Sequence, residues 1–430
     1  IMYNKIKLLA QQYHQETIQT RRDFHKYAER GWLEMRTASL VARRLDSLGY
    51  QVSVGKEVMR EEFRMGLPSK RLLTLNYNRA LLQGADPYYI EKVKNGFTGV
   101  VGVMHNGIGP VVAIRFDIDA LSITEDDSAD HNPGKNGFIS CNPGAMHACG
   151  HDGHMAALLG LAKKLKEQPL KWKHNILLIF QPAEESPGGA KLIVEAGILK
   201  QYNVRAIFGL HLMPTIEAGK IACRPGPLMA QNGELDVTIT GKSAHAGLYH
   251  LGIDSIMIAS QIICQYQSII SRVIAPVESC VINIGEIQGG TVRNIVADQT
   301  TFKGTVRTYS ETVFKKITDT MEAINHGMEQ TYGCTIEFRC PPMYPPVLND
   351  YDLYRQFVRL TDENYEELKE PLMLAEDFSF YQKEVPGIFF YVGTKTPKYF
   401  SGLHTETFNF DEEVLMQAVE LYYRLADKIK

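Results

Sequence analysis

The sequence predicts an α/β protein in which a mostly parallel sheet is flanked by helices and a smaller α+β domain is inserted. Three observations lead to this fold class. Short, continuously apolar segments alternate with helix-like segments through much of the 430-residue chain. Polar residues directly follow several of these apolar segments. A long stretch in the second half breaks the alternation and carries β-type segments of its own. Short apolar strands separated by helices are typical of a parallel sheet covered on both faces.

The first hundred residues are mainly helical in pattern. Spaced apolar positions among many charges predict a long amphipathic surface helix over residues 4–29. A second helix is expected from Thr37, a favourable N-cap, to Gly49, a favourable residue just past a helix end. Residues 58–96 are irregular and highly charged, and we interpret them as an excursion between this helix and the next strands.

Four apolar segments are predicted to form the core strands of the sheet, at residues 111–116, 175–180, 206–210 and 388–392. Helices are expected between them, for example over 154–167 and 189–196. In parallel sheets, function lies just beyond the carboxyl ends of the strands. The acidic and histidine residues that follow these strands are Asp117, Asp119, Glu184, Glu185 and His211.

The stretch 226–340 has a different pattern. Its predicted strands are 234–240, 280–286, 300–307 and 335–339, and a helix is expected over 311–332. We therefore predict two domains: residues 1–225 together with 341–430 form the α/β domain, and residues 226–340 form the inserted α+β domain.

Composition and charge exclude several classes of protein. The formal charge is −3, and 44% of the residues are apolar. A nucleic-acid-binding protein would need a basic face, and no apolar run approaches the roughly 20 residues of a membrane span. The N-terminal stretch is polar, unlike a signal peptide. The 7 cysteines are odd in number and contain no CxxC pair, which favours a reducing cytoplasm over a disulfide framework.

Residues 146–154 read Met-His-Ala-Cys-Gly-His-Asp-Gly-His and concentrate metal-binding side chains in one loop. Imidazole and thiolate suit Zn²⁺ and other borderline transition metals. The Cys-x-His spacing of Cys149 and His151 lets both side chains converge from a turn that opens a helix. The alternative, a closed structural zinc site made by this loop alone, is disfavoured because neighbours in a short loop rarely complete a tetrahedron.

Other parts of the chain supply further candidate ligands. Glu184 and Glu185 follow a buried strand and Pro182, where two charges are poorly solvated. One carboxylate can bind metal while its neighbour takes a proton from water. His211 follows an apolar strand and His404 lies in a Gly-Leu-His-Thr segment, and each alone would more often be structural.

Taken together, these motifs resemble the M20-type metal-dependent amidohydrolases and peptidases. The matching stretches, which span nearly the whole chain, are 116–121, 146–154, 180–185, 209–211, 241–245, 294–296, 304–307, 375–378 and 403–404. The cysteine in the second stretch resembles the acylamino-acid branch, which comprises hippurate, auxin-conjugate and aminobenzoyl-glutamate hydrolases. Softer motifs at 31–38 and 64–68 resemble the A-type subunit of aminobenzoyl-glutamate hydrolases.

The resemblance implies a role for each matching residue. It implies two divalent metal ions, Mn²⁺ or Zn²⁺, and makes the α/β domain the catalytic metal-binding domain and the insertion a lid or dimerisation domain. The implied ligands are Cys149, His151, Glu185, His211 and His404. Glu184 is the implied general base and acid, and Asp119 the residue that orients a ligand. The implied substrate-binding residues are His245, which reaches across a dimer, Asn294 and Arg307.

Some positions depart from the pattern or keep a simpler reading. Related branches place a ligand histidine where Asp117 stands and a bridging aspartate where His151 stands, which leaves the metal open. We expect His147 and His154 to be structural residues of the loop. If Arg307 and Asn294 end antiparallel neighbouring strands, they lie on one face. Arg307 could instead make a surface ion pair, and Asn294 could cap a turn.

We therefore predict a dinuclear metallohydrolase that cleaves the amide bond of an N-acyl or N-aroyl amino acid, with p-aminobenzoyl-glutamate as the best guess. Two ions about 3.5–4 Å apart would share a hydroxide, with Glu184 taking the proton of the water. One alternative is a broad N-acyl-amino-acid or hippurate-type deacylase. Another is a protein that is active only with a homologous partner. The expected dimer is therefore a homodimer if the chain acts alone, or a heterodimer if it needs such a partner. A dipeptidase is disfavoured, because that branch keeps the other ligand set.

Overall fold

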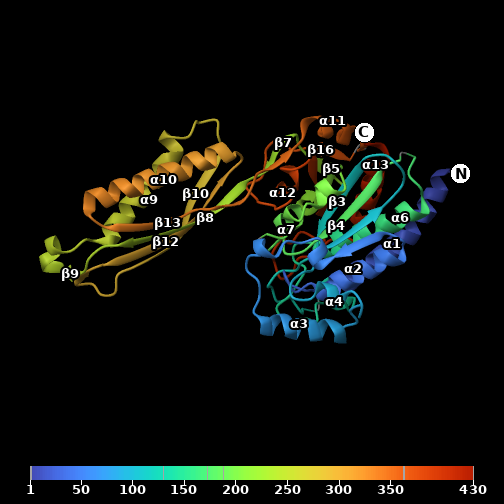
Figure 1. The fold of residues 1–430 in the computed structure, drawn as a ribbon, viewed down its shortest axis with the longest axis horizontal. Helices are drawn as coiled ribbons and strands as arrows, with labels where there is room; N and C mark the ends of the chain where they lie inside the picture. Colours follow the sequence, from blue (N-terminus) through green and yellow to red (C-terminus); the bar gives the residue numbers. More distant parts are fainter. Residues whose placement is uncertain (1, 129, 172, 187, 362–363, 430) are drawn as a thin grey trace. The chain divides into compact units, whose positions relative to one another are not determined.

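The computed structural model describes residues 2–128, 130–171, 173–186, 188–361 and 364–429. The chain forms two compact units (Figure 1). The first comprises residues 1–226, 348–369 and 380–430, and the second comprises residues 227–347 and 370–379.

The first unit contains most of the helices and the larger sheet. Its helices are α1 (Met2–Lys26), α2 (Met35–Ser47), α3 (Lys70–Leu82), α4 (Ile90–Val93), α5 (Asn132–Lys135), α6 (His151–Glu167), α7 (Gly189–Glu195), α8 (Ile198–Gln201), α11 (Tyr351–Leu360), α12 (Ser379–Gln382) and α13 (Val414–Lys428). Its strands are β1 (Gln51–Val54), β2 (Val100–Met104), β3 (Val111–Asp117), β4 (Asn175–Gln181), β5 (Val204–Glu217), β6 (Ile221–Cys223), β16 (Tyr365–Glu367) and β17 (Gly387–Lys395). Short 3₁₀ turns lie at Gly55–Glu57 and Glu61–Phe63.

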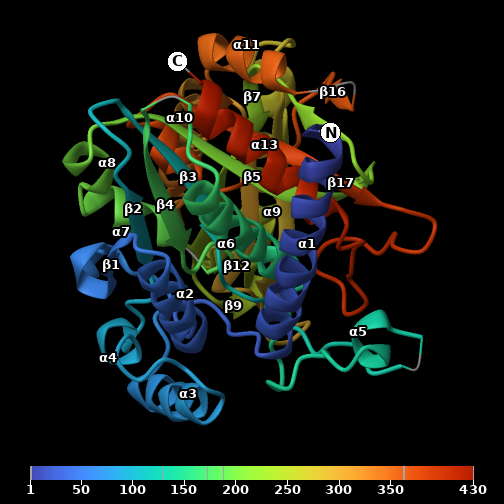
Figure 2. The same cartoon turned by 90° about the vertical axis from the view of Figure 1, so that its right-hand side faces the viewer.

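The larger sheet has the strand order β1-β2-β4-β3-β5-β17-β6-β16. Its central strands β4, β3, β5 and β17 run parallel. The pairs β1–β2, β2–β4 and β17–β6 are antiparallel. The central strands are buried along most of their length because helices cover both faces. Helices α1, α6 and α13 pack together on one face (Figure 2), and α7 packs against β4 on the other. The predicted fold class, a mostly parallel sheet flanked by helices, is confirmed.

Two local predictions for this unit are wrong in detail. Strand β5 runs from Val204 to Glu217, so His211 lies inside a strand and not after one. Helix α2 begins before Thr37, because the buried carboxylate of Glu29 accepts the backbone N–H groups of Arg36 and Thr37 and thereby caps the helix from outside. The predicted end is confirmed, since Gly49 adopts a φ of 76°.

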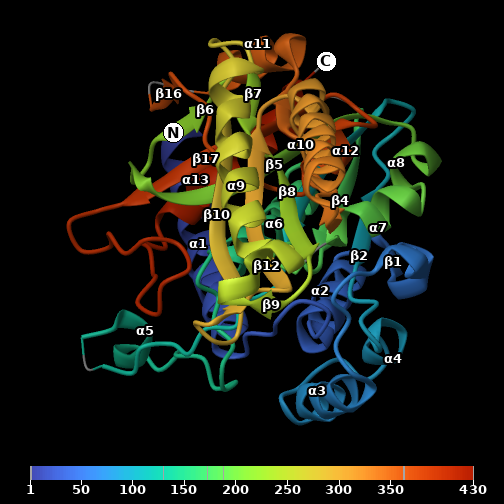
Figure 3. The same ribbon diagram turned by 90° about the vertical axis from the view of Figure 1, so that its left-hand side faces the viewer.

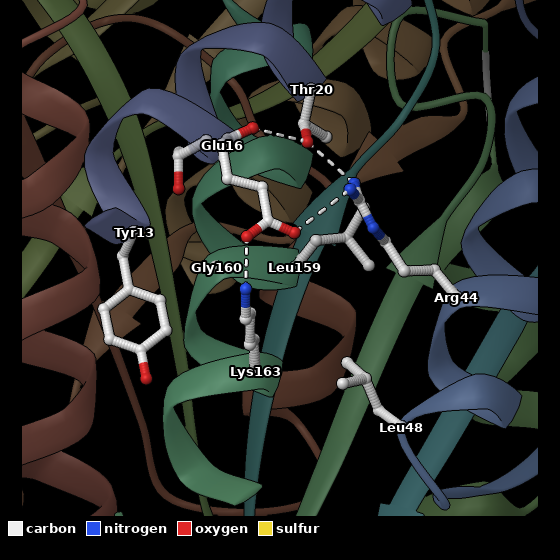
Figure 4. A pocket seen from close by; sticks show the side chains of 9 residues that line it. Tyr13, Glu16, Thr20, Arg44, Leu48, Leu159, Gly160 and Lys163 are labelled. Atoms are coloured by element: carbon white, nitrogen blue, oxygen red, sulfur yellow. Dashed lines mark hydrogen bonds and ion pairs between the residues drawn. The ribbon is translucent and has the colours of Figure 1, made fainter. Parts of the chain in front are cut away.

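Ion pairs join the N-terminal helix α1 to helices α2 and α6. Figure 4 shows a small pocket between α1, α2 and α6 in which Glu16 pairs with Lys163. Arg44 donates to the Thr20 hydroxyl at 2.7 Å and lies 3.6 Å from Glu16. Each charged side chain here is already paired, so the pocket joins three helices and offers no charge to a ligand.

The second unit is an antiparallel sheet with helices on one face. Its strands are β7 (Gly226–Met229), β8 (Gln231–Thr240), β9 (Ala244–His245), β10 (Cys280–Gly289), β11 (Ile295–Val296), β12 (Gln299–Thr308), β13 (Thr335–Arg339), β14 (Pro342–Tyr344) and, at its border, β15 (Val347–Asn349). Helices α9 (Ser255–Arg272) and α10 (Glu311–Tyr332) cover one face of the sheet β10-β12-β8-β13 (Figure 3). A 3₁₀ turn spans Ala246–Leu251. Phe302, Ile262 and Ile317 are fully buried between sheet and helices.

The boundary between the units differs from the predicted boundary at residues 340 and 341. Strand β14 continues the pairing with β8, which places residues 341–347 in the second unit. Residues 370–379 also belong there, because Leu372 donates its N–H to the Leu228 carbonyl and Ala230 donates to the Leu374 carbonyl. Backbone pairing between segments more than a hundred residues apart decided this border.

All seven cysteines lie in the described part of the chain, and all are free thiols. Among the described helices, none is long and apolar enough to cross a membrane.

A buried ionic cluster joins α1 to the start of α6. Asp152 Oδ2 accepts from Arg21 Nε at 2.7 Å and lies 2.8 Å from His25 Nδ1. His25 Nε2 lies 2.8 Å from Glu125 Oε1, which is also 2.9 Å from His131 Nε2. An imidazole between two carboxylates is held as the cation. The cluster therefore balances charges that are almost entirely out of water.

This cluster predicts loss of stability in acid. Despite its burial, hydrogen bonds from His131 and His25 lower the pKa of Glu125 to about 2. A depressed carboxyl pKa stabilises the fold above the unfolded value of about 4.3, and this contribution is lost as the pH falls from about 5 towards 2. The contribution is on the order of 3 kcal/mol. We expect Glu125→Gln to lower the unfolding free energy at pH 7 and to flatten its fall between pH 5 and pH 3.

Urea unfolding of the metal-free wild type and variant at several pH values measures both effects. His25 acts in the opposite direction: its pKa is raised by hydrogen bonds to Asp152 and Glu125 against its burial, so its contribution is lost as the pH rises through that raised value. Parallel stability curves for wild type and Glu125→Gln in acid would contradict the assignment to Glu125.

Candidate metal centre

The loop that carries Cys149 turns sharply into α6. Gly150 adopts a φ of 88°, a left-handed conformation that favours glycine, and α6 begins at the next residue, His151. A Cβ at this glycine would also come within 3.3 Å of Leu212. The turn places the thiol and the imidazole on the same side, as the Cys-x-His spacing predicted. Cys149 is buried and His151 is completely so.

The five predicted ligands converge on one thiol. Cys149 Sγ lies 3.2 Å from His211 Nε2 and 3.3 Å from His404 Nε2. Glu185 Oε1 is 3.1 Å from His404 Nε2. Two sets of possible ligands, Cys149 with His151 and His211, and Cys149 with Glu185 and His404, each have their ligand atoms within 4.8 Å of one another. The thiol is thus common to both sets.

His211 is oriented by its own backbone neighbour. Its Nδ1 lies 2.6 Å from the carbonyl oxygen of Leu212, so Nδ1 carries the proton and the lone pair of Nε2 faces the Cys149 thiol. Burial lowers the pKa of His211 to about 3, which keeps the ring neutral. A neutral imidazole with its second nitrogen hydrogen-bonded is the usual form of a metal ligand.

The donor set fits divalent metal ions. One thiol, three imidazoles and one carboxylate are the sulfur, nitrogen and oxygen donors that Zn²⁺ and related ions take. The pKa of the Cys149 thiol is raised well above its ordinary value by burial and by the charges of Glu185 and Glu184. A bound cation removes that penalty and lets the thiolate form. His151 Nε2 is fully buried and makes no hydrogen bond to the described residues. Despite this burial, the carboxylates of Asp117, Asp119 and Glu185 raise the pKa of His151 to about 10, and a bound cation would favour loss of that proton.

Asp119 holds the segment that carries the two glutamates. Its two carboxylate oxygens accept the backbone N–H groups of Glu184 at 3.1 Å and Glu185 at 3.0 Å. Asp119 Oδ1 also lies 3.3 Å from His151 Nδ1, which leaves Nε2 to face the metal centre. Ligand atoms of Glu184, Glu185 and His151 lie within 4.8 Å of one another. These contacts place Asp119 between the glutamate segment and His151, and its orienting role stays a prediction.

A second buried carboxylate supports the same segment and was missed from the sequence. Glu34 Oε1 accepts the N–H of Ala183 at 2.9 Å, and Ala183 has a positive φ of 52°. The other oxygen of Glu34 accepts from the Thr98 hydroxyl at 2.7 Å. The available signal was a charged residue inside the otherwise apolar run Trp32-Leu33-Glu34-Met35.

Three further polar residues lie near the predicted ligands. Asp117 accepts from His154 at 2.6 Å and from Arg115 at 3.2 Å, and its Oδ2 lies 3.7 Å from His151 Nε2, so it borders the ligand set. His154 lies in α6 and not in the loop. His147 is buried, and neither of its ring nitrogens makes a hydrogen bond within the described chain, for which the structure offers no reason.

The predicted substrate-binding residues all lie in the second unit, but not together. His245 and Asn294 are neighbours, because β9 pairs with β11 and Ala246 donates to the Asn294 carbonyl. His245 is exposed, and its Nδ1 accepts the N–H of Gly247, so its Nε2 carries the proton. Arg307 lies near the C-terminal end of β12, opposite Asn232 of β8. It donates to the Met373 carbonyl at 2.5 Å.

The expectation that Arg307 and Asn294 end neighbouring strands is therefore wrong. Strand β12 pairs with β8 and β10, whereas Asn294 precedes the separate short strand β11. Residues 299–307 alone span about 26 Å of extended strand. Within one chain, Arg307 lies far from the pair His245 and Asn294.

Comparison with known proteins decides the family. The sequence profile of peptidase family M20/M25/M40 matches residues 113–428. The chain belongs to this family. The predicted M20-type relationship and enzyme class, a metallohydrolase of linear amides, are confirmed.

Relatives of this M20 chain include several amide hydrolases. A p-aminobenzoyl-glutamate hydrolase subunit of Escherichia coli is 36% identical over 422 residues, 94% of each chain. The indole-3-acetyl-aspartic acid hydrolase of Enterobacter agglomerans is 36% identical over 420 residues, again 94% of each chain. An N-acetyldiaminopimelate deacetylase of Listeria monocytogenes is 36% identical over 345 residues, 77% of this chain and 90% of the relative.

Solved structures agree with this relationship. A dinuclear metal-binding peptidase of the M20 family from Bacillus subtilis has a TM-score of 0.75 and 30% identity, covering 97% of this chain and 98% of the other. An aminobenzoyl-glutamate utilization protein from Klebsiella pneumoniae has a TM-score of 0.71 and 28% identity, covering 98% of each chain.

Proposed function

We propose that this chain hydrolyses the amide bond of an N-acyl or N-aroyl amino acid, with p-aminobenzoyl-glutamate as the first substrate to test. The observation that supports this is the convergence of Cys149, His151, Glu185, His211 and His404, with Glu184 beside them. Two bound Mn²⁺ or Zn²⁺ ions would polarise the amide carbonyl and make water acidic enough to attack it.

The residues of the chain divide the remaining work. Glu184 takes the proton of the attacking water and passes it to the leaving amine, while Asp119 holds its backbone in place. His245 offers an Nε2–H to the carbonyl oxygen as negative charge develops there. Arg307 clamps the α-carboxylate with its planar guanidinium, and Asn294 binds the substrate near His245.

The names of the relatives support both candidate substrate classes. The names of two of them specify an aromatic acyl group on an acidic amino acid: p-aminobenzoyl-glutamate and indole-3-acetyl-aspartic acid. The deacetylase relative supports the second candidate, a broader N-acyl-amino-acid or hippurate-type deacylase.

A matched substrate panel separates these candidates. The purified chain, loaded with Mn²⁺ or Zn²⁺ and analysed for metal content, is assayed on p-aminobenzoyl-glutamate, p-aminobenzoyl-glutamine, hippurate and N-acetyldiaminopimelate. We expect kcat/KM to be highest for the aroyl-glutamate. Preference for the acetyl compound would favour the deacylase. Absence of turnover on every amide, with two ions bound, would favour a chain that needs a homologous partner.

We further propose that the chain acts as a dimer in which His245 and Asn294 serve the partner's site. The long strand β10 is an edge of the second sheet and exposes Val281 and Ile287, and the turn after β9 exposes Leu248 and Tyr249. Unpaired strand edges and apolar patches favour association. The distance between Arg307 and the His245 region also supports two chains contributing to one substrate site. The partner is either a second copy or a homologous chain, since the Escherichia coli relative is named as one subunit of its hydrolase.

The free thiols support a cytoplasmic location.

Mixing two inactive variants tests the dimer. We expect His245→Ala and Glu184→Gln homodimers to be nearly inactive, each for its own reason. A heterodimer has one intact composite site, so a statistical mixture should recover about a quarter of wild-type activity. The assay follows activity after subunit exchange, which is confirmed by native mass spectrometry. Exchange without recovery would place His245 in its own chain's site or outside catalysis.

A further inference from the structure

A fully buried imidazole lies between two of the proposed ligands without being one. His154 is on α6, three residues after His151, and its ring centroid is 5.3 Å from that of His151 and 4.8 Å from that of His211. The first pair is stacked and the second is edge-on. A displacement of the His154 ring would therefore displace the rings of both His151 and His211.

The protonation of His154 follows from a backbone donor. The N–H of Leu212 donates to His154 Nε2 at 3.0 Å, so Nε2 must be the unprotonated nitrogen. Nδ1 then carries the proton and donates to Asp117 Oδ1 at 2.6 Å. Asp117 Oδ2 accepts from Arg115 Nη1 at 3.2 Å, and Arg115 Nε donates to Gln181 at 2.7 Å. A chain of buried hydrogen bonds thus connects β4, β3, α6 and β5.

The bond to Leu212 replaces a missing strand partner. Strand β3 pairs with β5 only as far as Gly209, so beyond that residue the β5 backbone has lost its neighbour on that side. The side chain of His154 supplies the acceptor for the Leu212 N–H there. Without this acceptor the buried N–H would have no partner, which is unfavourable. The carbonyl of the same residue, Leu212, accepts from His211 Nδ1 at 2.6 Å.

We propose that His154 is a positioning residue for His211: it fixes the Leu212 backbone, and the Leu212 carbonyl in turn fixes the ring that faces Cys149. This inference rests on the proposed metal centre. Asp117 has the supporting role of setting the tautomer of His154, and it is not itself a ligand. Neither residue touches the substrate or the metal in this scheme.

Two substitutions at one position separate the two hydrogen bonds. In His154→Asn the amide nitrogen occupies the place of Nδ1 and keeps the bond to Asp117, but nothing reaches Leu212. In His154→Gln the amide oxygen reaches the place of Nε2 and accepts from Leu212, but the bond to Asp117 is lost. We expect His154→Asn to weaken binding of one metal ion about 10–100-fold, the usual effect of removing a partner of a ligand histidine. His154→Gln should restore most of that loss.

Co²⁺ titration of the metal-free chain provides a readout besides activity. The thiolate-to-cobalt absorption reports Cys149, and the visible bands report the geometry around the ion. His154→Asn should change the visible bands and weaken one binding step, while the thiolate band of the other step persists. Leu158→Ala is the matched control, because Leu158 is a fully buried apolar residue of the same helix. It should lower the melting temperature without altering either binding step.

The outcomes are distinct. Wild-type affinity and spectrum in His154→Asn would overturn the inference, and so would an equal loss in Leu158→Ala, which would show a general effect of stability. A failure of His154→Gln to recover any affinity would also overturn it. If the wild type itself bound no Co²⁺ through a thiolate, the metal centre of the proposed function would fail, and the positioning role would fail with it.

Discussion

Glu184→Gln is expected to retain both metal ions and to lose nearly all turnover. The substitution is isosteric and removes the base, while the backbone N–H that Asp119 accepts is unchanged. Loss of a general base lowers the rate by a factor of about 10²–10⁴. The measurement is kcat on the best amide of the panel together with metal content by elemental analysis.

Glu185→Gln is the matched control for this prediction. It makes the same chemical change one residue away, but at a side chain whose oxygen lies 3.1 Å from His404 and belongs to the Cys149 set. We expect it to lose metal as well as activity. Near-normal turnover in Glu184→Gln would remove it from catalysis, and loss of metal there would make it a ligand instead.

Cys149→Ser is expected to weaken binding of both metal ions. Because the thiol lies within reach of both ligand sets, its loss affects each of them. A hydroxyl is a far poorer anionic ligand than a thiolate. Competition with a chelator measures the affinities, and we expect metal content after dialysis to fall below one ion per chain, with activity returning only at high metal concentration.

Cys223→Ser is the control for thiol loss. Cys223 is also buried, but its thiol accepts from the Asn349 side-chain amide at 3.3 Å and donates to the Phe389 carbonyl at 3.4 Å, and a serine hydroxyl can make both hydrogen bonds. It should keep both ions and full activity. Two tightly bound ions in Cys149→Ser would make Cys149 a buried apolar residue and leave the metal to the remaining side chains.

The extent of regular elements was largely predictable from local pattern. Helix α10 and strand β13 have the predicted bounds, 311–332 and 335–339, because apolar spacing, a Ser310 cap and Gly333 at the helix end act within a few residues. Strand β5 was predicted too short, ending before His211. Its second half contains His211 and Pro214, residues that suggest the end of a strand in sequence, but pairing with β17 continues as far as Glu217.

The candidate ligands were recognisable in the sequence because metal chemistry restricts them to a few residue types in distinctive motifs. Of the residues that orient them, only Asp119 was among the predictions. Glu34, His154 and Asp117 are ordinary polar residues in sequence, and each binds a group 37 or more positions away in the chain.

By itself, the sequence determined the fold class and the family, and it supplied the candidate metal ligands. The tertiary structure alone decided that Cys149 is common to both ligand sets, that His154 supports the backbone beside His211, and that Arg307 lies far from Asn294 within one chain. The physical reason is that local pattern encodes burial and backbone preference. Which buried polar group satisfies which backbone N–H depends on where each strand's pairing begins and ends.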